Sequence, residues 1–334
     1  MSPPPEPVST PSPVADVLLH DGTIATIRRT VPDDLDALRG LHAGLGAESY
    51  RRRFFGTGTA LAADYLHHLA TAPDVIALVA EREGRTVALG TAEPVAEELA
   101  EVAFVVAEDC HGLGLGSLLL EHLAAEGRAR GFTRFAAEVM SDNREMLDVF
   151  AHAGFAETHR TDRGTVELAM ATDLTPLAVA AADAKERVAE AESLRPLLDP
   201  RSVAVVGVRS DGTGVGAALL RSIVEGGFDG GIAVVHPRLA GVEGIGVWRS
   251  FAEVPERVDL AVVAVPARQV LDVLSEAAAA GVRAAVVVSS GFEELGADGA
   301  QAQRAILDLA RRHSMRVVGP NCLGIVSRAP GRLL

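Results

Sequence analysis

Apolar and polar positions alternate along much of the first half of the chain, with stretches of helical spacing in between. Residues 23–31 (TIATIRRTV) alternate at a period of two, which is typical of a half-buried strand. Strands are expected at 23–31, 75–81, 85–92, 99–106, 135–140 and 166–170. Helices are expected from Pro32 onward, at 48–55, at 118–130 and at 143–153. The first half is therefore predicted to be an α/β domain that contains a meander of strands.

The pattern changes in the second half of the chain. Residues 177–194 are rich in Ala and Glu at helical spacing, which predicts a helical linker. After Ser202 the apolar runs VAVVGV, IAVVHP, LAVVAVP, AAVVVSSG and RVVGPN alternate with segments of helical character. Short continuous apolar strands separated by helices are typical of a parallel sheet that is covered on both faces. The second half is therefore predicted to be a doubly wound, Rossmann-like α/β domain.

The length of 334 residues suits two domains rather than one. The shifts in pattern and composition predict four segments. They are a Pro/Ser-rich disordered leader at 1–15, a first domain at 16–172, a helical linker at 173–195 and a second domain at 196–334.

Composition excludes several classes of function. A net charge of −14 and an aromatic content of 4% argue against a protein that binds nucleic acid or an anionic membrane. The sequence holds no apolar run long enough for a membrane helix. Cys110 and Cys322 lie far apart and form no metal-ligand spacing, which favours a reducing, cytoplasmic location and no metal site.

A glycine-rich turn, Cys110–Gly116 (CHGLGLG), stands between an apolar strand and an apolar-faced helix. Glycines let the backbone approach a ligand closely, and the N-terminus of the following helix favours negative charge. The turn therefore suits a pyrophosphate, although a tight turn without a ligand would have the same composition.

The order of elements around this turn resembles that of the GNAT acyl-CoA-dependent acetyltransferases, over about residues 16–172. The family has a mixed, mostly antiparallel sheet with helices, and its loop Gln/Arg-x-x-Gly-x-Gly/Ala binds the pyrophosphate of acetyl-CoA. His111, Gly114 and Gly116 stand at those positions, and Asn143 matches a downstream Asn near the pantetheine arm. The resemblance implies a donor site made of Val105, Val106, His111, Gly112, Leu113, Gly114, Leu115, Gly116 and Asn143.

Acetyl transfer to an amine requires a base, because a lysine ammonium has a pKa of about 10.4. Glu101 lies on the strand that leads to the glycine turn, where related protein acetyltransferases carry their catalytic Glu; Glu97 and Glu98 are its neighbours. A solvated strand residue is the alternative for Glu101. Many family members carry a Tyr seven residues after the Asn to protonate the leaving thiolate, but this chain has Phe150 there.

The stretch Glu48–Phe55 (ESYRRRFF) resembles a segment of the bacterial two-domain protein lysine acetyltransferases, and could help to form the acceptor side. An amphipathic helix that buries Phe54 and Phe55 is an equally good interpretation. Lys185 is the one lysine of the chain and is expected to be a solvated residue of the linker.

The second half contains another glycine-rich turn, Gly207–Gly216, after its first strand. A turn in that place is the usual dinucleotide position, but an NAD site would also carry Asp or Glu at the end of the next strand. That strand ends in His236-Pro237-Arg238, and a cation there favours a phosphorylated ribose, as in NADP or CoA.

The later strand ends decide between the two cofactors. The series Val265-Pro266, Ser289-Ser290-Gly291 and Gly319-Pro320-Asn321-Cys322-Leu323-Gly324 resembles the CoA-binding domain of NDP-forming acyl-CoA synthetases, over about residues 196–327. The resemblance implies that CoA or acyl-CoA binds at Gly207, Arg209, Ser210, Gly214, Gly216, Pro237, Arg238, Val265, Pro266, Ser290, Gly291 and Asn321. A nucleotide fold that no longer binds a ligand is the alternative.

Related synthetases continue into a ligase domain and an ATP-grasp domain, which this sequence does not contain, so acyl-CoA synthesis is not expected of it. The GNAT-before-synthetase order resembles that of actinobacterial protein acetyltransferases. It implies acetyl transfer from acetyl-CoA to a protein lysine, for example of an acyl-CoA synthetase, with a regulatory CoA-binding domain. The alternatives are an acyl-CoA sensor with little turnover and a small-amine acetyltransferase; self-association into a homo-oligomer is left open.

Overall fold

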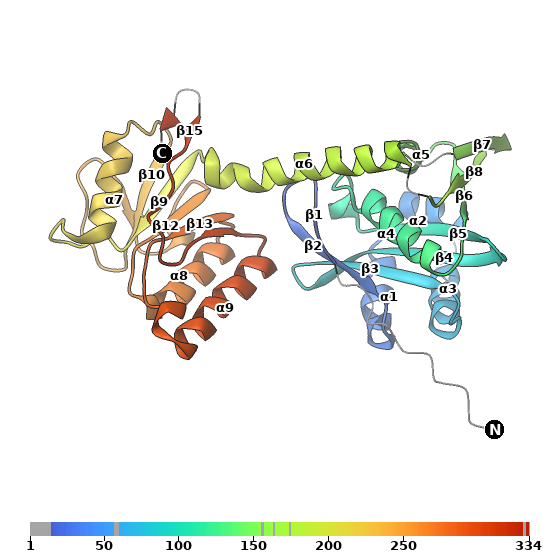
Figure 1. The fold of residues 1–334 in the computed structure, drawn as a ribbon, viewed down its shortest axis with the longest axis horizontal. Helices are drawn as coiled ribbons and strands as arrows, with labels where there is room; N and C mark the ends of the chain where they lie inside the picture. Colours follow the sequence, from blue (N-terminus) through green and yellow to red (C-terminus); the bar gives the residue numbers. More distant parts are fainter. Residues whose placement is uncertain are drawn as a thin grey trace, which may run out of the picture. The chain divides into compact units, whose positions relative to one another are not determined.

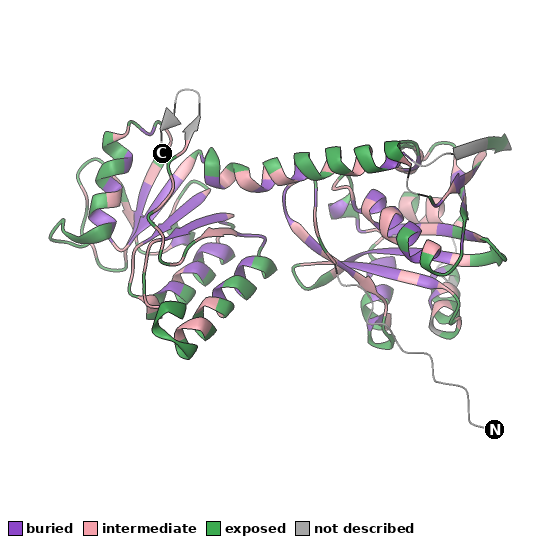
Figure 2. Cartoon of the chain, in the orientation of Figure 1, coloured by how far each residue is buried: buried purple, intermediate pink, exposed green. Residues whose placement is uncertain are grey.

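The computed structural model describes residues 15–56, 60–154, 157–162, 164–173, 175–329 and 332–333 (Figure 1). The chain divides into two compact units. Unit 1 comprises Met1–His20 and Ala25–Val188, and unit 2 comprises Asp21–Ile24 and Ala189–Leu334. In both units the buried residues lie on the strands and on the inner faces of the helices (Figure 2).

Unit 1 is built on an eight-stranded sheet in the order β1-β2-β3-β4-β5-β6-β8-β7. Its strands are β1 (Ala15–Leu18), β2 (Ile24–Arg29), β3 (Ile76–Arg82), β4 (Arg85–Ala96), β5 (Leu99–Val106), β6 (Arg134–Met140), β7 (Glu157–Asp162) and β8 (Thr165–Ala171). The pairs from β2 to β5 and from β6 to β7 are antiparallel, whereas β5 and β6 run parallel. The mixed, mostly antiparallel sheet predicted for this half is confirmed.

The parallel pair β5–β6 is short, and this creates the space for a site. Pairing runs from Leu99 with Arg134 to Glu101 with Ala136 and stops there. β5 continues to Val106 and remains paired with β4 along that length. The two strands therefore part after Glu101, which leaves one edge of β5 available for another hydrogen-bonding partner.

Helices cover both faces of this sheet. They are α1 (Leu35–Ala43), α2 (Ala47–Phe54), α3 (Ala60–Thr71), α4 (Leu115–Ala129) and α5 (Arg144–Ala151). On β4, a Cβ at Gly90 would lie 3.2 Å from Leu119 of α4, while Thr91 hydrogen-bonds Tyr65 of α3 at 2.7 Å. Successive strand residues point to opposite faces, so α3 and α4 lie on opposite sides of the sheet.

Several elements of unit 1 differ from the sequence-based expectation. Helix α4 begins at Leu115 rather than at residue 118, directly after the glycine turn. The pattern also missed β1, α3 and β7. β7 has the sequence ETHRTD and lies at the sheet edge, where a strand needs little apolar surface and so leaves no clear signal.

Unit 2 contains a six-stranded, wholly parallel sheet in the order β11-β10-β9-β12-β13-β14. Its strands are β9 (Ser202–Val206), β10 (Gly231–Val235), β11 (Gly246–Trp248), β12 (Leu260–Val263), β13 (Ala284–Val287) and β14 (Arg316–Val318). Two apolar clusters pack on this sheet, together with α7 (Gly214–Glu225), α8 (Ala267–Ala279) and α9 (Ala297–Arg312). The doubly wound fold is confirmed; the three-residue edge strand β11 was too short to predict.

The predicted linker helix is α6 (Pro176–Leu198). A short hairpin of β15 (Arg328–Ala329) and β16 (Arg332–Leu333) follows the parallel sheet. The predicted leader at 1–15 lies almost wholly outside the described residues.

Candidate active site

A cavity of about 570 Å³ opens in unit 1 where β5 and β6 part. It is lined by residues of the two strands, of α2, of the glycine turn, and of α4, α5 and α6. Among the predicted site residues, those that line it are Glu101, Val105, Val106, His111, Gly112, Gly114, Leu115, Gly116 and Asn143. Leu113 does not line it; its side chain packs against the core, and its carbonyl accepts a hydrogen bond from the His20 N–H at 3.1 Å.

The glycine turn has a backbone that only glycine adopts easily. Gly112 and Gly114 have φ angles of +74° and +87°. A Cβ at Gly114 would lie 2.7 Å from Nε2 of His20, which closes the space beside the turn. The His20 ring also lies 3.2 Å through Nδ1 from the Gly112 carbonyl, so the chain after β1 supports the turn.

The N-terminus of α4 is not capped by the described part of the chain. Gly114 occupies the cap position and no side chain bonds to the first turn. The first backbone hydrogen bond of the helix joins the Leu118 N–H to the Gly114 carbonyl, at 3.1 Å. The N–H groups of Leu115, Gly116 and Ser117 have no acceptor among the described residues, and all three residues line the cavity. Such amides form an anion-binding position.

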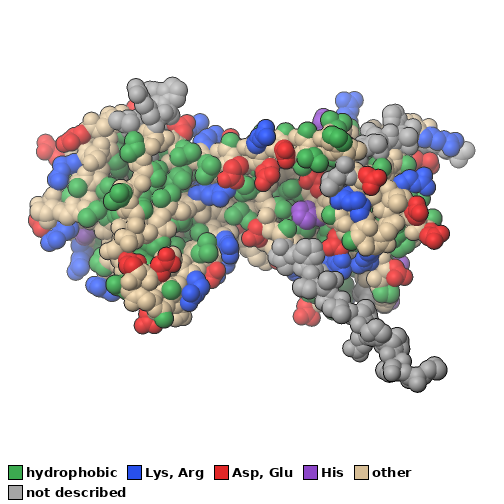
Figure 3. All heavy atoms as spheres, viewed as in Figure 1, with side chains coloured by type: hydrophobic (Ala, Val, Ile, Leu, Met, Phe, Trp, Pro, Cys, Tyr) green, Lys and Arg blue, Asp and Glu red, His purple; other side chains and the backbone are tan. Residues whose placement is uncertain are grey.

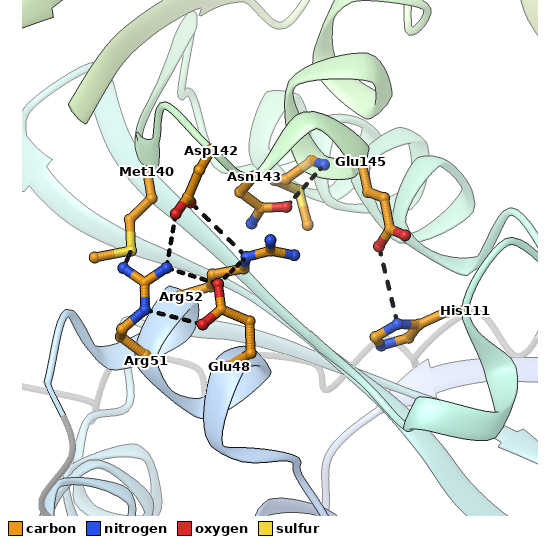
Figure 4. Close-up of polar contacts among 9 residues, drawn as sticks. Glu48, Arg51, Arg52, His111, Met140, Asp142, Asn143 and Glu145 are labelled. Carbon is orange, nitrogen blue, oxygen red and sulfur yellow. Dashed lines mark hydrogen bonds and ion pairs between the residues drawn. The ribbon is translucent and has the colours of Figure 1, made fainter. Parts of the chain in front are cut away.

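His111 of the glycine turn and Asn143 at the start of α5 are each fixed by a hydrogen bond to the backbone. His111 Nε2 lies 3.1 Å from the Val106 carbonyl, and its Nδ1 lies 3.9 Å from the Glu145 carboxylate (Figure 4). Asn143 caps α5, and its side-chain oxygen accepts from the Met146 N–H at 3.3 Å. Its side chain also lines the cavity.

Glu101 is the last β5 residue that pairs with β6, and its exposed side chain lines the cavity. A second carboxylate, Glu138 of β6, lines the same wall. Phe150 is 2% exposed and packs edge-on against Phe104, with ring centroids 6.1 Å apart. At the Phe150 position the wall therefore offers no proton donor.

Helix α2 is held over the cavity by ion pairs. Arg51 bonds Glu48 at 2.6 Å and Asp142, in the turn between β6 and α5, at 2.7 Å (Figure 4). Arg52 joins the same two carboxylates at 3.0 and 3.8 Å. α2 is a helix as predicted, but it does not bury the two phenylalanines: Phe54 is half-buried, and Phe55 follows the helix with 43% of its surface exposed. α2 also forms part of the cavity wall through Arg52 and Arg53.

Glu108 ties α2 to the turn that precedes the glycines. Its carboxylate accepts from the Gly46 N–H at 2.8 Å, and hydrogen bonds from the Ser49 side chain and from Gly46 lower its pKa. The neighbouring Cys110 is buried, and this burial raises the pKa of its thiol. Cys110 is therefore an inert wall residue rather than a nucleophile.

The predicted residues of unit 2 follow the carboxyl ends of parallel strands. β9, β10 and β12 are aligned at Val206, Val235 and Val263, and β13 is aligned with β12 at Val287. The predicted positions lie in the segments that follow these ends, with Gly214 and Gly216 in the first turn of α7 and Asn321 after β14 (Arg316–Val318); they are Gly207, Arg209, Ser210, Gly214, Gly216, Pro237, Arg238, Val265, Pro266, Ser290, Gly291 and Asn321. The structure therefore brings them to one edge of the sheet, where open α/β sheets bind ligands.

The glycines of the unit 2 turn serve close packing. A Cβ at Gly207 would lie 2.3 Å from the Ala264 carbonyl, and one at Gly216 would lie 2.4 Å from the Gly207 carbonyl. Between them, Asp211 accepts from the N–H and hydroxyl of Thr213 at 3.0 and 2.6 Å, and these bonds lower its pKa. Arg209 pairs with Asp211 at 3.3 Å, and Arg238 is exposed.

Three residues of the unit 1 site were missed by sequence reasoning: His20, Glu108 and Lys185. His20 and Lys185 reach the site from elements distant in sequence from the glycine turn, whereas Glu108 directly precedes the turn but lies outside its motif. For Lys185, the one available signal was that the sequence contains a single lysine.

Two findings bear on the classes of site. Within the described ranges, no group of three or more His, Cys, Asp or Glu side chains is arranged to hold a metal ion. No described helix has the length and apolar character of a membrane span.

Acidic and basic side chains are interspersed on the face shown in Figure 3.

Two family models match the chain. The acetyltransferase (GNAT) family matches residues 46–155, and the CoA binding domain matches residues 201–328. The first match includes the cavity residues from Ser49 to Phe150, and the second includes the whole carboxyl edge of the unit 2 sheet.

The chain is also similar to curated relatives and to solved structures. The alpha subunit of acetate–CoA ligase [ADP-forming] I from Pyrococcus furiosus is 38% identical over 138 residues, which cover 40% of this chain and 30% of the relative. The GNAT domain of S. lividans PAT is 34% identical, with a TM-score of 0.45 over 47% of this chain and 96% of that one. A dinucleotide-forming acetyl-coenzyme A synthetase from Ca. Korarchaeum cryptofilum is 36% identical, with a TM-score of 0.40 over 42% of this chain and 30% of that one. The chain therefore spans less than a third of these ligases. It carries an N-terminal GNAT acetyltransferase domain and a C-terminal CoA-binding domain of the ADP-forming acyl-CoA synthetase type.

Proposed function

We propose that this protein transfers acetyl groups from acetyl-CoA to lysine side chains of other proteins. One observation carries the proposal: a single cavity joins the uncapped amides at the start of α4 to the carboxylate of Glu101. The amides suit the diphosphate of the donor, and the carboxylate suits the proton of the amine.

The groove left by the parting strands fits the pantetheine arm. The arm carries amide groups, and β5 beyond Glu101 has an edge that β6 does not pair. Hydrogen bonds to this edge would extend the donor as an added strand. The thioester would then lie near Glu101 and Asn143, at the opposite side of the cavity from the glycine turn.

Glu101 acts as the base in this proposal. It accepts a proton from the acceptor ammonium, directly or through water, because only the neutral amine attacks the thioester carbonyl. The new N–C bond forms, the C–S bond breaks, and the second amine proton leaves to solvent. The thiolate takes its proton from water, since Phe150 occupies the position where a donor side chain would be needed.

The acceptor would enter beside α2. Arg52, Arg53 and Phe55 belong to the cavity wall on that side, and the segment 48–55 resembles that of the two-domain protein lysine acetyltransferases. The fold of unit 2 supports CoA or acyl-CoA binding at its carboxyl edge, and in this proposal that binding regulates the transfer. An acyl-CoA synthetase is the protein acceptor that this pairing of domains favours.

Glu101→Gln tests the assignment. With acetyl-CoA and purified acyl-CoA synthetase as acceptor, kcat for thiol release is expected to fall about 100-fold or more, while the Kd for acetyl-CoA stays unchanged. Glu138→Gln is the matched control, because it removes the second carboxylate of the wall and should leave kcat within about twofold. Equal losses in both variants would remove Glu101 from the role of base.

A second function, acyl-CoA sensing with little turnover, is favoured by Phe150. A site without a donor for the thiolate could hold acetyl-CoA rather than consume it. Tight binding of acetyl-CoA without acetylated lysines, read by mass spectrometry after incubation with a cytosolic lysate, would favour the sensor over the enzyme.

A further inference from the structure

Lys185 lies in the wall of the unit 1 cavity, although it belongs to α6 and follows the segment matched by the GNAT family. Its Nζ lies 3.1 Å from the Glu121 carboxylate of α4. Both side chains are about three-quarters buried, with 23% and 25% exposed. The one lysine of the chain is therefore held at the cavity rather than solvated, contrary to the sequence-based expectation.

The residues that line the cavity belong to two groups of elements. One group is on β5 and β6 and includes Glu101. The other group, called here the helix-lined arm, is on or next to α4, α5 and α6 and includes Asp148, His152 and Lys185. Glu121, the partner of Lys185, stands seven residues after Gly114, which is about 10 Å along α4. Lys185 thus belongs to the helix-lined arm of the cavity.

The donor molecule also has two parts, one on each side of its diphosphate. With its diphosphate on the amides of α4 and its thioester near Glu101, the remaining part of the donor would extend from the diphosphate toward the helix-lined arm. That part is the adenosine with its ribose 3′-phosphate, the second strongly anionic group of the molecule.

The charges of the cavity wall favour Lys185 as the partner of such a group. The permanently cationic side chains among the described wall residues are Arg52, Arg53 and Lys185, and both arginines are on α2. The helix-lined arm also presents the exposed carboxylate of Asp148, which repels a phosphate. An ammonium has three donors, so Lys185 can keep Glu121 and bind a phosphate oxygen as well.

We propose that Lys185 binds the 3′-phosphate of the donor, with Glu121 positioning its ammonium. The inference rests on the proposed function, because it needs the diphosphate on the glycine turn. It adds a recognition residue from outside the segment that the GNAT family model matches. It predicts that the site distinguishes CoA from 3′-dephospho-CoA.

Lysine footprinting of the full chain gives a direct test. An N-hydroxysuccinimide acetyl ester acylates amines, and in this chain the N-terminus and Lys185 are the amines available. The N-terminal peptide serves as the internal reference in mass spectrometry. Saturating CoA is expected to slow acylation of Lys185 about tenfold, the size of one charge-assisted hydrogen bond, and 3′-dephospho-CoA to slow it little. Equal protection of Lys185 by both ligands, or no protection by either ligand, would overturn the inference.

Steady-state kinetics supply an independent readout. Lys185→Met should raise KM for acetyl-CoA about tenfold and leave KM for acetyl-3′-dephospho-CoA unchanged, whereas Lys185→Arg should retain most of the discrimination. Arg187→Met is the control, because it removes an exposed charge two residues along the same helix. If the wild-type chain uses both donors equally, the inference fails and the proposed function stands; if it uses neither, the proposed function fails first.

Discussion

The two units each present a glycine-rich turn at the start of a helix, yet the glycines answer different physical needs. In unit 1, Gly112 and Gly114 adopt positive φ and leave the amides of α4 facing a cavity. In unit 2, Gly207 also has a positive φ, but a Cβ at Gly207 or at Gly216 would meet a backbone carbonyl oxygen within 2.4 Å, whereas the nearest atom to a Cβ at Gly114 is a side-chain nitrogen of His20. Two turns of similar composition therefore differ in how closely backbone packs against their glycines.

Gly114→Glu should give the largest difference between the two turns. The new side chain would meet His20, adopt a disfavoured backbone conformation and place a carboxylate beside the donor diphosphate. We expect kcat/KM for acetyl-CoA to fall about 100-fold or more, since several charge-assisted bonds are lost. Gly212→Glu in unit 2, at a φ of +68° with open space around it, should leave that value unchanged. Similar losses of kcat/KM in both variants would contradict the difference proposed between the two turns.

Gly207→Ala should act on stability instead of on transfer. Its Cβ would overlap the Ala264 carbonyl at a φ of +100°, at a cost of about 3 kcal/mol to the unfolding free energy of unit 2. Thermal unfolding followed by calorimetry would report the loss as a lower Tm. Gly212→Ala should cost about 1 kcal/mol, because positive φ is then the sole penalty. A Gly207→Ala chain that unfolds like the wild type would contradict the packing role.

Arg238→Glu examines whether the unit 2 turn also binds a ligand. Placed at the end of β10, the exposed cation should hold the 3′-phosphate of CoA. The Gly114→Glu chain serves as the background, because it is expected not to bind the donor in unit 1. In that background, calorimetric titration should show that Arg238→Glu weakens CoA binding about tenfold and hardly changes binding of 3′-dephospho-CoA. An equal loss for both ligands would remove the phosphate role.

The smallest effects concern the carboxylates that hold the turns, Glu108 and Asp211. Hydrogen bonds from Ser49 and Gly46 keep the pKa of Glu108 below its usual 4.5, and those from Thr213 keep that of Asp211 below 3.8. A lowered folded-state pKa gives stability above the usual value that is lost as pH falls through the lowered one. The Tm deficits of Glu108→Gln and Asp211→Asn should therefore shrink between pH 7 and pH 3. A deficit independent of pH would show that charge plays no part.

Local patterns were sufficient to predict both sheets and the place of both turns. Alternation marked β4 and β5, and continuous apolar runs marked β9 and β12. The parting of β5 from β6 left no such trace, since it is a matter of pairing between distant segments. The same holds for His20 and Lys185, whose roles arise from elements that fold against the turn or the cavity from elsewhere in the chain.

A structure of the full chain crystallised with acetyl-CoA would test the central claim most directly. The diphosphate is expected within hydrogen-bond distance of the N–H groups of Leu115 and Gly116, with the thioester close to Glu101. If the bound donor leaves these amides untouched and its diphosphate rests on another part of unit 1, the assignment of this cavity as the donor site is wrong.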